Sequence, residues 1–224
     1  RARGAVSLRI ALAAGTPLAE TLDLFAAAGV PVAPLRQVGA SPLQELPDGT
    51  VVLATRAADV PLFVERGGAD IGVVGKEILV EVERDVYELL DLRVGRARLV
   101  FAQPEDASGA WDEEHGPSRV RVATRFPETT RRYFEASGRQ VNVLALEGPV
   151  EAAPRLRLAD GVVDLVRSGE TLRRAGLTER EQIAECSLRL IAGRAAHALR
   201  AAEIGALIGR LRELTERSES GGEA

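Results

Sequence analysis

Short apolar runs that alternate with helical patterns constrain the fold of this 224-residue chain more than any other feature. Each run has the length of a buried strand, and each is followed by a segment with the periodicity or the start signals of a helix. Strands that alternate with helices predict an α/β fold with mainly parallel sheets. The predicted strands are residues 8–12, 51–54, 71–74, 120–124, 141–146 and 161–166.

Two extended segments divide this alternation into two lobes. Residues 86–101 separate the first series of strands and helices from the second, and residues 183–192 become extended again after it. We expect both segments to cross between lobes. The predicted first lobe therefore combines residues 1–96 with 182–224, and the second contains residues 97–181.

The most informative strand ends in a turn of small and polar residues. The apolar run Gly161–Val166 breaks into Ser168-Gly169-Glu170-Thr171 and then a helical pattern. Backbone N–H groups and hydroxyls at a helix start can bind a phosphate. Asp164, inside the apolar strand, costs free energy to bury without a partner, and its carboxylate could hold the two hydroxyls of a ribose. A ribose 5-phosphate would fit these groups; an ordinary turn capped by Ser168 is the alternative.

Composition argues against several classes of function. Cys186 is the only cysteine, so the chain has no disulfide framework and no cysteine zinc cluster. With only His115 and His197, a histidine metal site or a Ser/His/Asp triad has little support. A formal charge of −4 and 4% aromatic residues give no reason to expect nucleic acid or an anionic membrane as a partner.

The beginning of the chain does not have the pattern of a secretory signal. Arg9 interrupts its apolar segment, which leaves less than the roughly 7 residues that such a signal needs. No run approaches the ~20 apolar residues of a membrane span. We therefore expect a cytoplasmic protein.

Three separated blocks resemble, in the same order, the ATP phosphoribosyltransferase family, whose members catalyse the first step of histidine biosynthesis. The blocks are Asp59-Val60-Pro61 with Ala69–Lys76, then Val122–Phe134, and finally Gly148…Glu151, Ala153-Pro154, Leu158-Ala159-Asp160 and Val163–Leu172. The resemblance implies a two-lobed, periplasmic-binding-protein-like type II fold with the active site in the inter-lobe cleft.

The resemblance also implies which residues form the site. The substrates would be 5-phosphoribosyl 1-pyrophosphate (PRPP) and ATP. For PRPP the expected residues are Asp160, Asp164, Ser168, Gly169, Glu170 and Thr171; for ATP or the cleft, Gly15, Thr16, Asp70, Thr124 and Arg125; and for catalysis, Arg56, Lys76 and Glu151. Arg56 and Lys76 would neutralise phosphate groups, and Glu151 would contact ribose or magnesium. A surface lysine and a solvated helix position are the alternatives for Lys76 and Glu151.

The chain departs from the family pattern at two places. The family usually has Pro-Lys-Gly-Arg after its first strand, whereas this chain has Ala13-Ala14-Gly15-Thr16 and so lacks both cations. The family also usually has glycine where this chain has Arg157. The first departure predicts a weaker enzyme, unless Arg56, Lys76 or Arg157 supplies the missing charge.

The implied reaction joins adenine N1 of ATP to C1 of PRPP, and magnesium-bound pyrophosphate leaves. We expect Mg²⁺ to arrive with PRPP rather than on a set of side-chain ligands. The chain ends soon after a predicted helix at 195–217, as in short-form members of the family. Such members resemble homodimeric catalytic chains that join a histidyl-tRNA-synthetase-like regulatory subunit in a hetero-octamer. A ligand-binding module without chemistry and a weak or regulatory paralogue are the alternatives.

Overall fold

The computed structural model describes residues 8–37, 41–105 and 120–220, except the side chains of 218–220. The chain forms two compact units: unit 1 comprises Arg1–Gly95 with Ser187–Ala224, and unit 2 comprises Arg96–Cys186. The return to the first unit therefore lies later than the expected residue 182. The reason is that β10 (Leu177–Cys186) pairs along its whole length with a strand of unit 2.

Unit 1 is built on a sheet with the strand order β2-β3-β1-β4-β11-β5. At its centre β1 pairs in parallel with β3 and β4, whereas β2, β11 and β5 run antiparallel to their neighbours. The expectation of mainly parallel sheets is thus corrected to a mixed sheet, because β11 enters it against β4. The bounds are β1 Arg9–Ala13, β2 Leu43–Glu45, β3 Val51–Thr55, β4 Ile71–Gly75, β5 Tyr87–Asp91 and β11 Leu188–Ala192.

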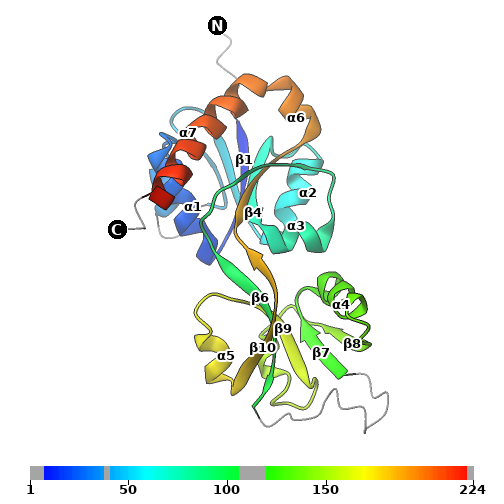
Figure 1. Ribbon diagram of the computed structural model, residues 1–224. Helices are drawn as coiled ribbons and strands as arrows, with labels where there is room; N and C mark the ends of the chain where they lie inside the picture. Colours follow the sequence, from blue (N-terminus) through cyan, green and yellow to red (C-terminus); the bar gives the residue numbers. More distant parts are fainter. Residues whose placement is uncertain (1–7, 38–40, 106–119, 221–224) are drawn as a thin grey trace, which may run out of the picture. The chain divides into compact units, whose positions relative to one another are not determined.

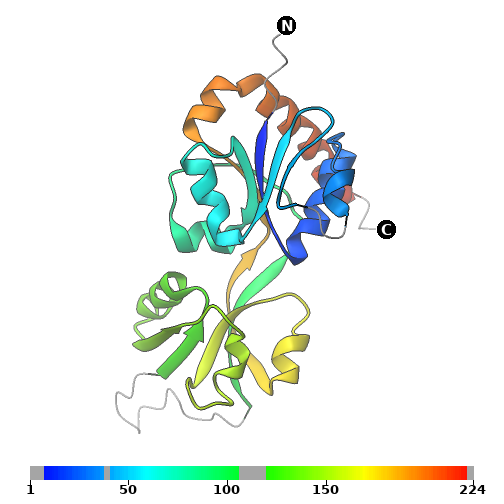
Figure 2. The ribbon, with the colours of Figure 1, turned by 180° about the vertical axis from the view of Figure 1, so that it is seen from behind.

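Helices cover both faces of this sheet (Figures 1 and 2). On one face α1 (Thr16–Ala27) and α7 (Ala201–Ser220) bury Phe25, Leu207 and Leu211 in the larger core. On the other face α2 (Val60–Glu65) and α3 (Lys76–Val82) pack against a smaller cluster. The predicted helix at 195–217 is divided at Arg200 into α6 (Arg194–Leu199) and α7. Short 3₁₀ turns, η1 (Ala33–Arg36) and η2 (Ala57–Asp59), complete the unit.

Unit 2 contains a second mixed sheet, with the order β10-β6-β9-β7-β8. Here β7 pairs in parallel with β8 and β9, and β6 runs antiparallel to both β9 and β10. The two sheets therefore share one feature: three neighbouring strands are parallel, and the remaining strands pair antiparallel. The bounds are β6 Ala97–Pro104, β7 Val120–Thr124, β8 Val141–Ala145 and β9 Gly161–Val166.

The second sheet is also covered on both faces. On one face α4 (Pro127–Ala136) packs Phe134 edge-to-face on Phe101 of β6, with ring centroids 5.2 Å apart. The other face carries η4 (Val150–Ala152) and α5 (Glu170–Arg174), which enclose a core of small and branched side chains. The helix expected at 150–156 is only the turn η4, because Pro154 lacks an N–H and restricts the residue before it. In the described residues no helix is long and apolar enough to cross a bilayer.

Candidate functional site

Four of the six predicted PRPP residues, Asp164, Ser168, Gly169 and Thr171, meet where β7 and β9 end. These strands are parallel and in register, with Thr124 opposite Val163, so the residues that follow them lie side by side. Ligands of open α/β sheets bind beyond the carboxyl ends of such strands. A cavity of about 190 Å³ lies at this place and is lined by Asp164, Leu165, Val166, Arg167, Ser168, Gly169, Thr171 and Leu172.

The turn after β9 has the backbone shape that its glycine predicts. Gly169 is left-handed (φ 76°, ψ 1°) and caps the start of α5. The Glu170 N–H donates to the Ser168 hydroxyl at 3.4 Å. Because α5 has only five residues, its dipole contributes little, and the local N–H groups and hydroxyls must provide any phosphate contact. The Glu170 side chain does not line the cavity and pairs instead with Arg174 on the same helix.

Asp164 has the partner that its apolar setting requires. Its side chain is 12% exposed, and Oδ1 accepts a hydrogen bond from Arg125 Nη2 at 2.8 Å. Arg125 follows β7 directly and is half-exposed, so its guanidinium anchors Asp164 from the solvent side. The structure therefore brings Arg125 and Asp164, both predicted site residues, into one ion pair beside the cavity.

Thr124 and Glu151 have different settings. Thr124 is fully buried, and its hydroxyl oxygen accepts from the Phe126 N–H at 2.9 Å and lies 3.3 Å from the Thr130 hydroxyl. It therefore holds the start of α4 and does not line the cavity, contrary to the expectation that it faces the ligand. Glu151 lies half-buried on η4, which follows the carboxyl end of β8.

The predicted cations of unit 1 gather at the carboxyl edge of its sheet. Arg56 follows β3, Gly15 and Thr16 follow β1, and Lys76 follows β4, and these strands are neighbours in the order β3-β1-β4. Gly15 (φ 90°), rather than Thr16, is the N-cap of α1, and Thr16 is exposed. Arg56 Nε lies 3.1 Å from Asp59 Oδ2, and Lys76 Nζ lies 2.6 Å from Glu88 Oε2. Both cations are therefore paired with carboxylates of their own unit.

An apolar cavity at the same edge was not predicted. Its volume is about 310 Å³, and it lies between α1, η1 and the hairpin of β2 and β3. No motif marks it, because its lining comes from separate elements whose residues are individually ordinary. The lining residues are Leu12, Ala14, Leu18, Leu35, Gln37, Ser41, Pro42, Gln44, Val52 and Ala54.

Asp70 lies at the opposite, amino edge of unit 1. Its Oδ2 accepts from the Arg9 backbone N–H at 2.8 Å, and its Oδ1 accepts from Arg9 Nη2 at 2.8 Å. Burial alone would raise the pKa of Asp70, but the hydrogen bonds and charge of Arg9, together with the charge of Arg200, outweigh burial and lower it. Asp70 thus ties the start of β4 to the start of β1. This position does not support the expectation that Asp70 contacts a ligand.

Asp160 has the same arrangement in unit 2. Its Oδ2 accepts from the Arg121 N–H at 2.9 Å, and its Oδ1 accepts from Arg121 Nη2 at 2.7 Å. The hydrogen bonds of the Arg121 side chain, helped by its backbone N–H and its charge, lower the pKa of Asp160 against a smaller effect of burial. Asp160 precedes β9, whereas the Ser168–Thr171 turn follows it, and a six-residue strand is about 20 Å long. Asp160 is therefore separated from the cavity that holds the other predicted PRPP residues.

Comparisons with known proteins agree over most of the chain. A family model described as ATP phosphoribosyltransferase matches residues 56–213. The ATP phosphoribosyltransferase of Symbiobacterium thermophilum is 44% identical over 214 residues, which cover 94% of this chain and 96% of that protein. The enzyme of the same name from Rubrobacter xylanophilus is 43% identical and covers 90% and 93%. The chain belongs to the ATP phosphoribosyltransferase family. The predicted enzyme class, which catalyses the first step of histidine biosynthesis, is confirmed.

Solved structures confirm the fold of this chain. The Thermotoga maritima ATP phosphoribosyl transferase (HisG:HisZ) complex contains a chain with a TM-score of 0.79 and 27% identity, covering 94% of this chain and 99% of that one. The alkanesulfonate-binding protein SsuA of Xanthomonas axonopodis pv. citri has a TM-score of 0.57 at 12% identity, covering 98% and 78%. The second likeness concerns the fold alone and confirms the periplasmic-binding-protein-like architecture.

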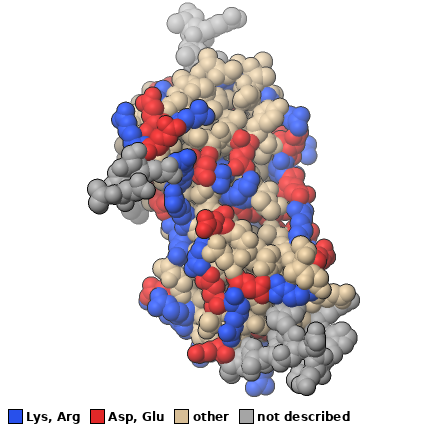
Figure 3. Space-filling view, viewed as in Figure 1, with Lys and Arg blue, Asp and Glu red and all other residues tan. Residues whose placement is uncertain are grey.

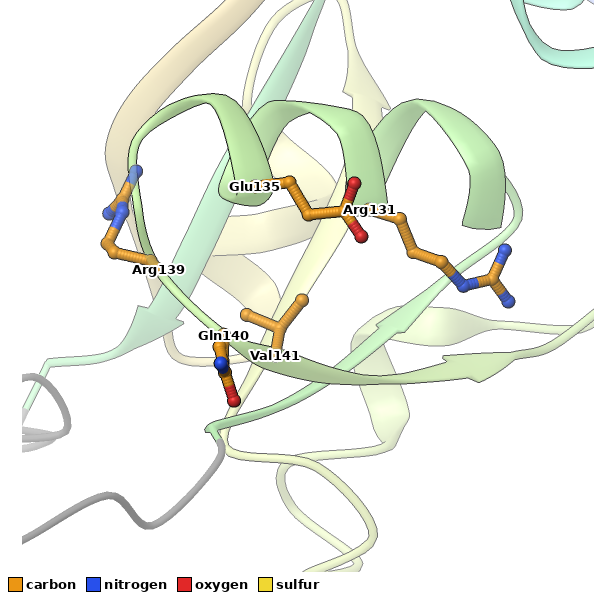
Figure 4. Close-up of a pocket in the computed structure, with 5 residues that line it drawn as sticks. All are labelled: Arg131, Glu135, Arg139, Gln140 and Val141. Carbon is orange, nitrogen blue, oxygen red and sulfur yellow. The ribbon is translucent and has the colours of Figure 1, made fainter.

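A third hollow lies away from the turn that follows β9. It measures about 310 Å³ and is lined by Arg131, Glu135, Arg139, Gln140 and Val141. Figure 4 shows Arg131 and Glu135 projecting from α4, with Gln140 and Val141 at the start of β8. Both arginines are held by carboxylates, Arg131 by Glu128 and Arg139 by Glu181. The hollow therefore does not offer an unpaired cation to an anionic ligand.

The distribution of charge on the family member is mixed. On the face in Figure 3, basic and acidic side chains alternate over both units rather than collecting in a single basic area. Among the described residues, no group of three or more His, Cys, Asp or Glu side chains could hold a metal ion.

Proposed function

We propose that this chain transfers the 5-phosphoribosyl group of PRPP to N1 of ATP, giving N1-(5-phosphoribosyl)-ATP and pyrophosphate. The observation that carries the proposal is the cavity at the end of β9, where Asp164, Ser168, Gly169 and Thr171 lie together. The N–H groups and hydroxyls of the turn bind the 5-phosphate, because a compact turn can aim several donors at one anion. Asp164 accepts hydrogen bonds from the ribose hydroxyls.

Arg125 supports this assignment by fixing the carboxylate of Asp164. A carboxylate has about four lone-pair positions, so one hydrogen bond from Arg125 at 2.8 Å leaves acceptor capacity for a diol. Because the bond is charge-assisted, it is a strong one, and it fixes the orientation of the Asp164 carboxylate. Glu151, on η4 next to β9, is the second carboxylate that we assign to the ribose side of the site.

The metal ion enters the proposal as part of the substrate. Mg²⁺ usually keeps several waters and binds substrate phosphates with few protein ligands. When bound, it would neutralise charge on the departing diphosphate. Arg56 and Lys76, at the carboxyl ends of β3 and β4, would add positive charge to the phosphates of PRPP or ATP.

The proposal includes a partner. The structurally similar Thermotoga maritima chain belongs to a HisG:HisZ complex. We propose that this chain likewise forms homodimers and joins a histidyl-tRNA-synthetase-like regulatory chain in a hetero-octamer. Regulation by histidine would then act through that second chain.

One assay tests the proposed reaction. The protein, with and without the regulatory chain, is incubated with PRPP, ATP and Mg²⁺, and phosphoribosyl-ATP is followed by its absorbance. Asp164→Asn, which keeps the size of the side chain but removes its charge, should lower kcat/KM by about tenfold or more, since a hydrogen bond to a charged group is worth about 1.5–3 kcal/mol. Glu213→Gln, on the exposed part of α7, is the matched control. Binding of PRPP and ATP without any product would instead support a binding module.

A further inference from the structure

A strong preference for arginine in this chain has a single exception. Of the 29 basic residues other than histidine, Lys76 is the only lysine. The two side chains differ in ways that matter at an anionic site: arginine presents a rigid fork that grips a carboxylate with two bonds, whereas lysine is a compact charge on a flexible stem. The single lysine therefore raises the question of which function at position 76 an arginine could not perform.

The contacts of Lys76 form part of a chain of ion pairs. Lys76 Nζ lies 2.6 Å from Glu88 Oε2, and the other oxygen of Glu88 accepts from Arg189 Nη1 at 3.1 Å. Arg189 Nη2 lies 3.0 Å from Asp91 Oδ2, and Asp91 Oδ1 accepts from the Ser187 hydroxyl at 2.8 Å. Glu88 is thus shared by two cations, one of which has a second carboxylate.

The two cations are held unequally. The Lys76 side chain is 37% exposed and has one ion-pair contact with the described residues, whereas Arg189 is 20% exposed and lies between two carboxylates. Partly exposed single ion pairs contribute little to stability. An incoming polyphosphate would therefore draw Lys76 away first. Glu88 would not be left unpaired, because Arg189 remains beside it.

We propose that Glu88 and Arg189 hold Lys76 ready at the carboxyl end of β4 and release it to a diphosphate group, so that Glu88 is a positioning residue. This inference rests on the proposed function, in which Lys76 meets the phosphates of a substrate. A lysine is required because its single contact with Glu88 can be exchanged. An arginine at position 76 would grip Glu88 with two bonds and stay there.

The single lysine provides a direct spectroscopic test. Reductive ¹³C-methylation keeps the positive charge and gives one side-chain signal, from Lys76, besides that of the N-terminus. Titration with inorganic pyrophosphate and Mg²⁺ should shift this signal saturably in the wild type. In Glu88→Gln the free protein's signal should already have moved, whereas in the control Asp85→Asn, which loses only the Asp85–Arg194 pair, it should stay in place.

The outcomes separate this inference from the proposed function. If the Lys76 signal does not shift with pyrophosphate in protein that does form phosphoribosyl-ATP, the proposal that Lys76 is released to a diphosphate is wrong. The proposed reaction would still stand. A protein that makes no phosphoribosyl-ATP with its regulatory chain present overturns the proposed function instead.

A rescue experiment tests the need for lysine. Lys76→Arg, assayed in the complex with the regulatory chain, should lower kcat/KM by about tenfold or more although the charge is unchanged. Adding Glu88→Gln removes the carboxylate that holds the arginine, and the double variant Lys76→Arg/Glu88→Gln should regain a large part of the loss. Thermal unfolding of each variant shows that it is folded. Full activity of Lys76→Arg, or a folded double variant no better than the single one, overturns the proposal.

Discussion

Gly169 shows how much a single residue reveals about this site. The Ser-Gly-x-Thr pattern predicted a turn after a strand, and the left-handed backbone of Gly169 is the conformation that makes glycine the favoured residue there. The position of Asp164 inside an apolar strand likewise predicted that its carboxylate needs a partner. The identity of that partner did not follow, because Arg125 is 39 positions away and only the parallel register of β7 and β9 brings the two together.

A pair of substitutions at Gly169 separates charge from backbone strain. Asn and Asp have the same shape and both tolerate the left-handed region, so Gly169→Asn and Gly169→Asp should lose similar stability. Only the aspartate adds a negative charge beside the phosphate, where a unit charge about 4 Å away is worth about 1–4 kcal/mol. Calorimetry should show PRPP binding at least about tenfold weaker for Asp than for Asn. Equal affinities would remove the 5-phosphate from this turn.

Arg157 is the second residue with a backbone consequence. It has φ 59°, a left-handed value, at the position where the family usually has glycine. A non-glycine residue there costs about 1–3 kcal/mol, and part of this is offset because glycine is more flexible in the unfolded chain. Arg157→Gly should therefore be more stable than Arg157→Ala by about 1 kcal/mol in urea unfolding, since alanine removes the side chain and keeps the strain. If alanine proves equal to glycine, the strain is absent.

At the scale of the elements, strand direction separates the residues that meet from those that do not. Asp70 and Asp160 each precede a strand of the parallel centre, and a residue before a strand lies at its amino end. The ligands of such sheets bind at the carboxyl end. The order of strands along the sequence therefore predicts that both aspartates lie at the amino edge, although the family motifs assigned them to the site.

The mixed parallel and antiparallel pairing of the sheets could not be predicted from the sequence pattern. Residues 183–192 read as a single extended segment, but the structure ends β10 at Cys186 and begins β11 at Leu188, each in a different sheet. The division between β10 and β11 depends on pairing with strands distant in the chain, and hydrophobic periodicity does not predict such pairing. The break of the last helix at Arg200 left no signal in the periodicity either.

The two Arg–Asp pairs at the amino edges should differ in their effect on stability. Asp70 is 4% exposed as a side chain, whereas Asp160 is 37% exposed. Removing one partner of a buried pair costs up to about 3–5 kcal/mol, and exposed pairs cost far less. In urea unfolding at pH 7, Asp70→Asn should therefore destabilise the protein more than Asp160→Asn. The reverse order would show that the Arg9–Asp70 contacts do not hold β1 to β4.

The pH dependence of this effect has a definite sign. The pKa of Asp70 in the folded protein lies below its ordinary value of 3.8. A carboxyl group with a lowered pKa contributes stability above the ordinary pKa, and the contribution is lost as the pH falls through the folded value. The difference in unfolding free energy between wild type and Asp70→Asn should be constant near neutrality and shrink below pH 3.8. A difference that persists unchanged at lower pH would place its origin in packing rather than in charge.

At the scale of the whole molecule, the feature of interest is the balance of charge at the carboxyl edge of the unit 1 sheet. PRPP and ATP are strongly anionic, yet the chain has a formal charge of −4. The two predicted phosphate-binding cations at that edge are each paired, Arg56 with Asp59 and Lys76 with Glu88. The loop that carries a lysine and an arginine in the family has Ala14 and Thr16 here, and both are exposed. The edge is therefore poor in uncompensated positive charge.

Restoring the two missing cations should raise activity. Ala14 and Thr16 are both exposed, so the longer side chains of Ala14→Lys with Thr16→Arg should be accommodated without strain elsewhere. One charge-assisted hydrogen bond is worth about 1.5–3 kcal/mol, and about 1.4 kcal/mol of transition-state stabilisation gives a tenfold rate effect. With the regulatory chain present, kcat/KM should rise by about tenfold or more.

A matched control decides whether the position of the added charge matters. Ala201→Lys with Ala202→Arg adds the same two charges at the exposed start of α7, next to Arg200, which approaches Asp70 at the amino edge of the sheet. Long-range attraction of anionic substrates would raise kcat/KM in both double variants and would weaken with salt. Local contact with the phosphates would raise it in the loop variant alone. If neither variant gains activity, the missing cations are already replaced, and measurement of ATP affinity in the loop variant shows whether ATP approaches this loop at all.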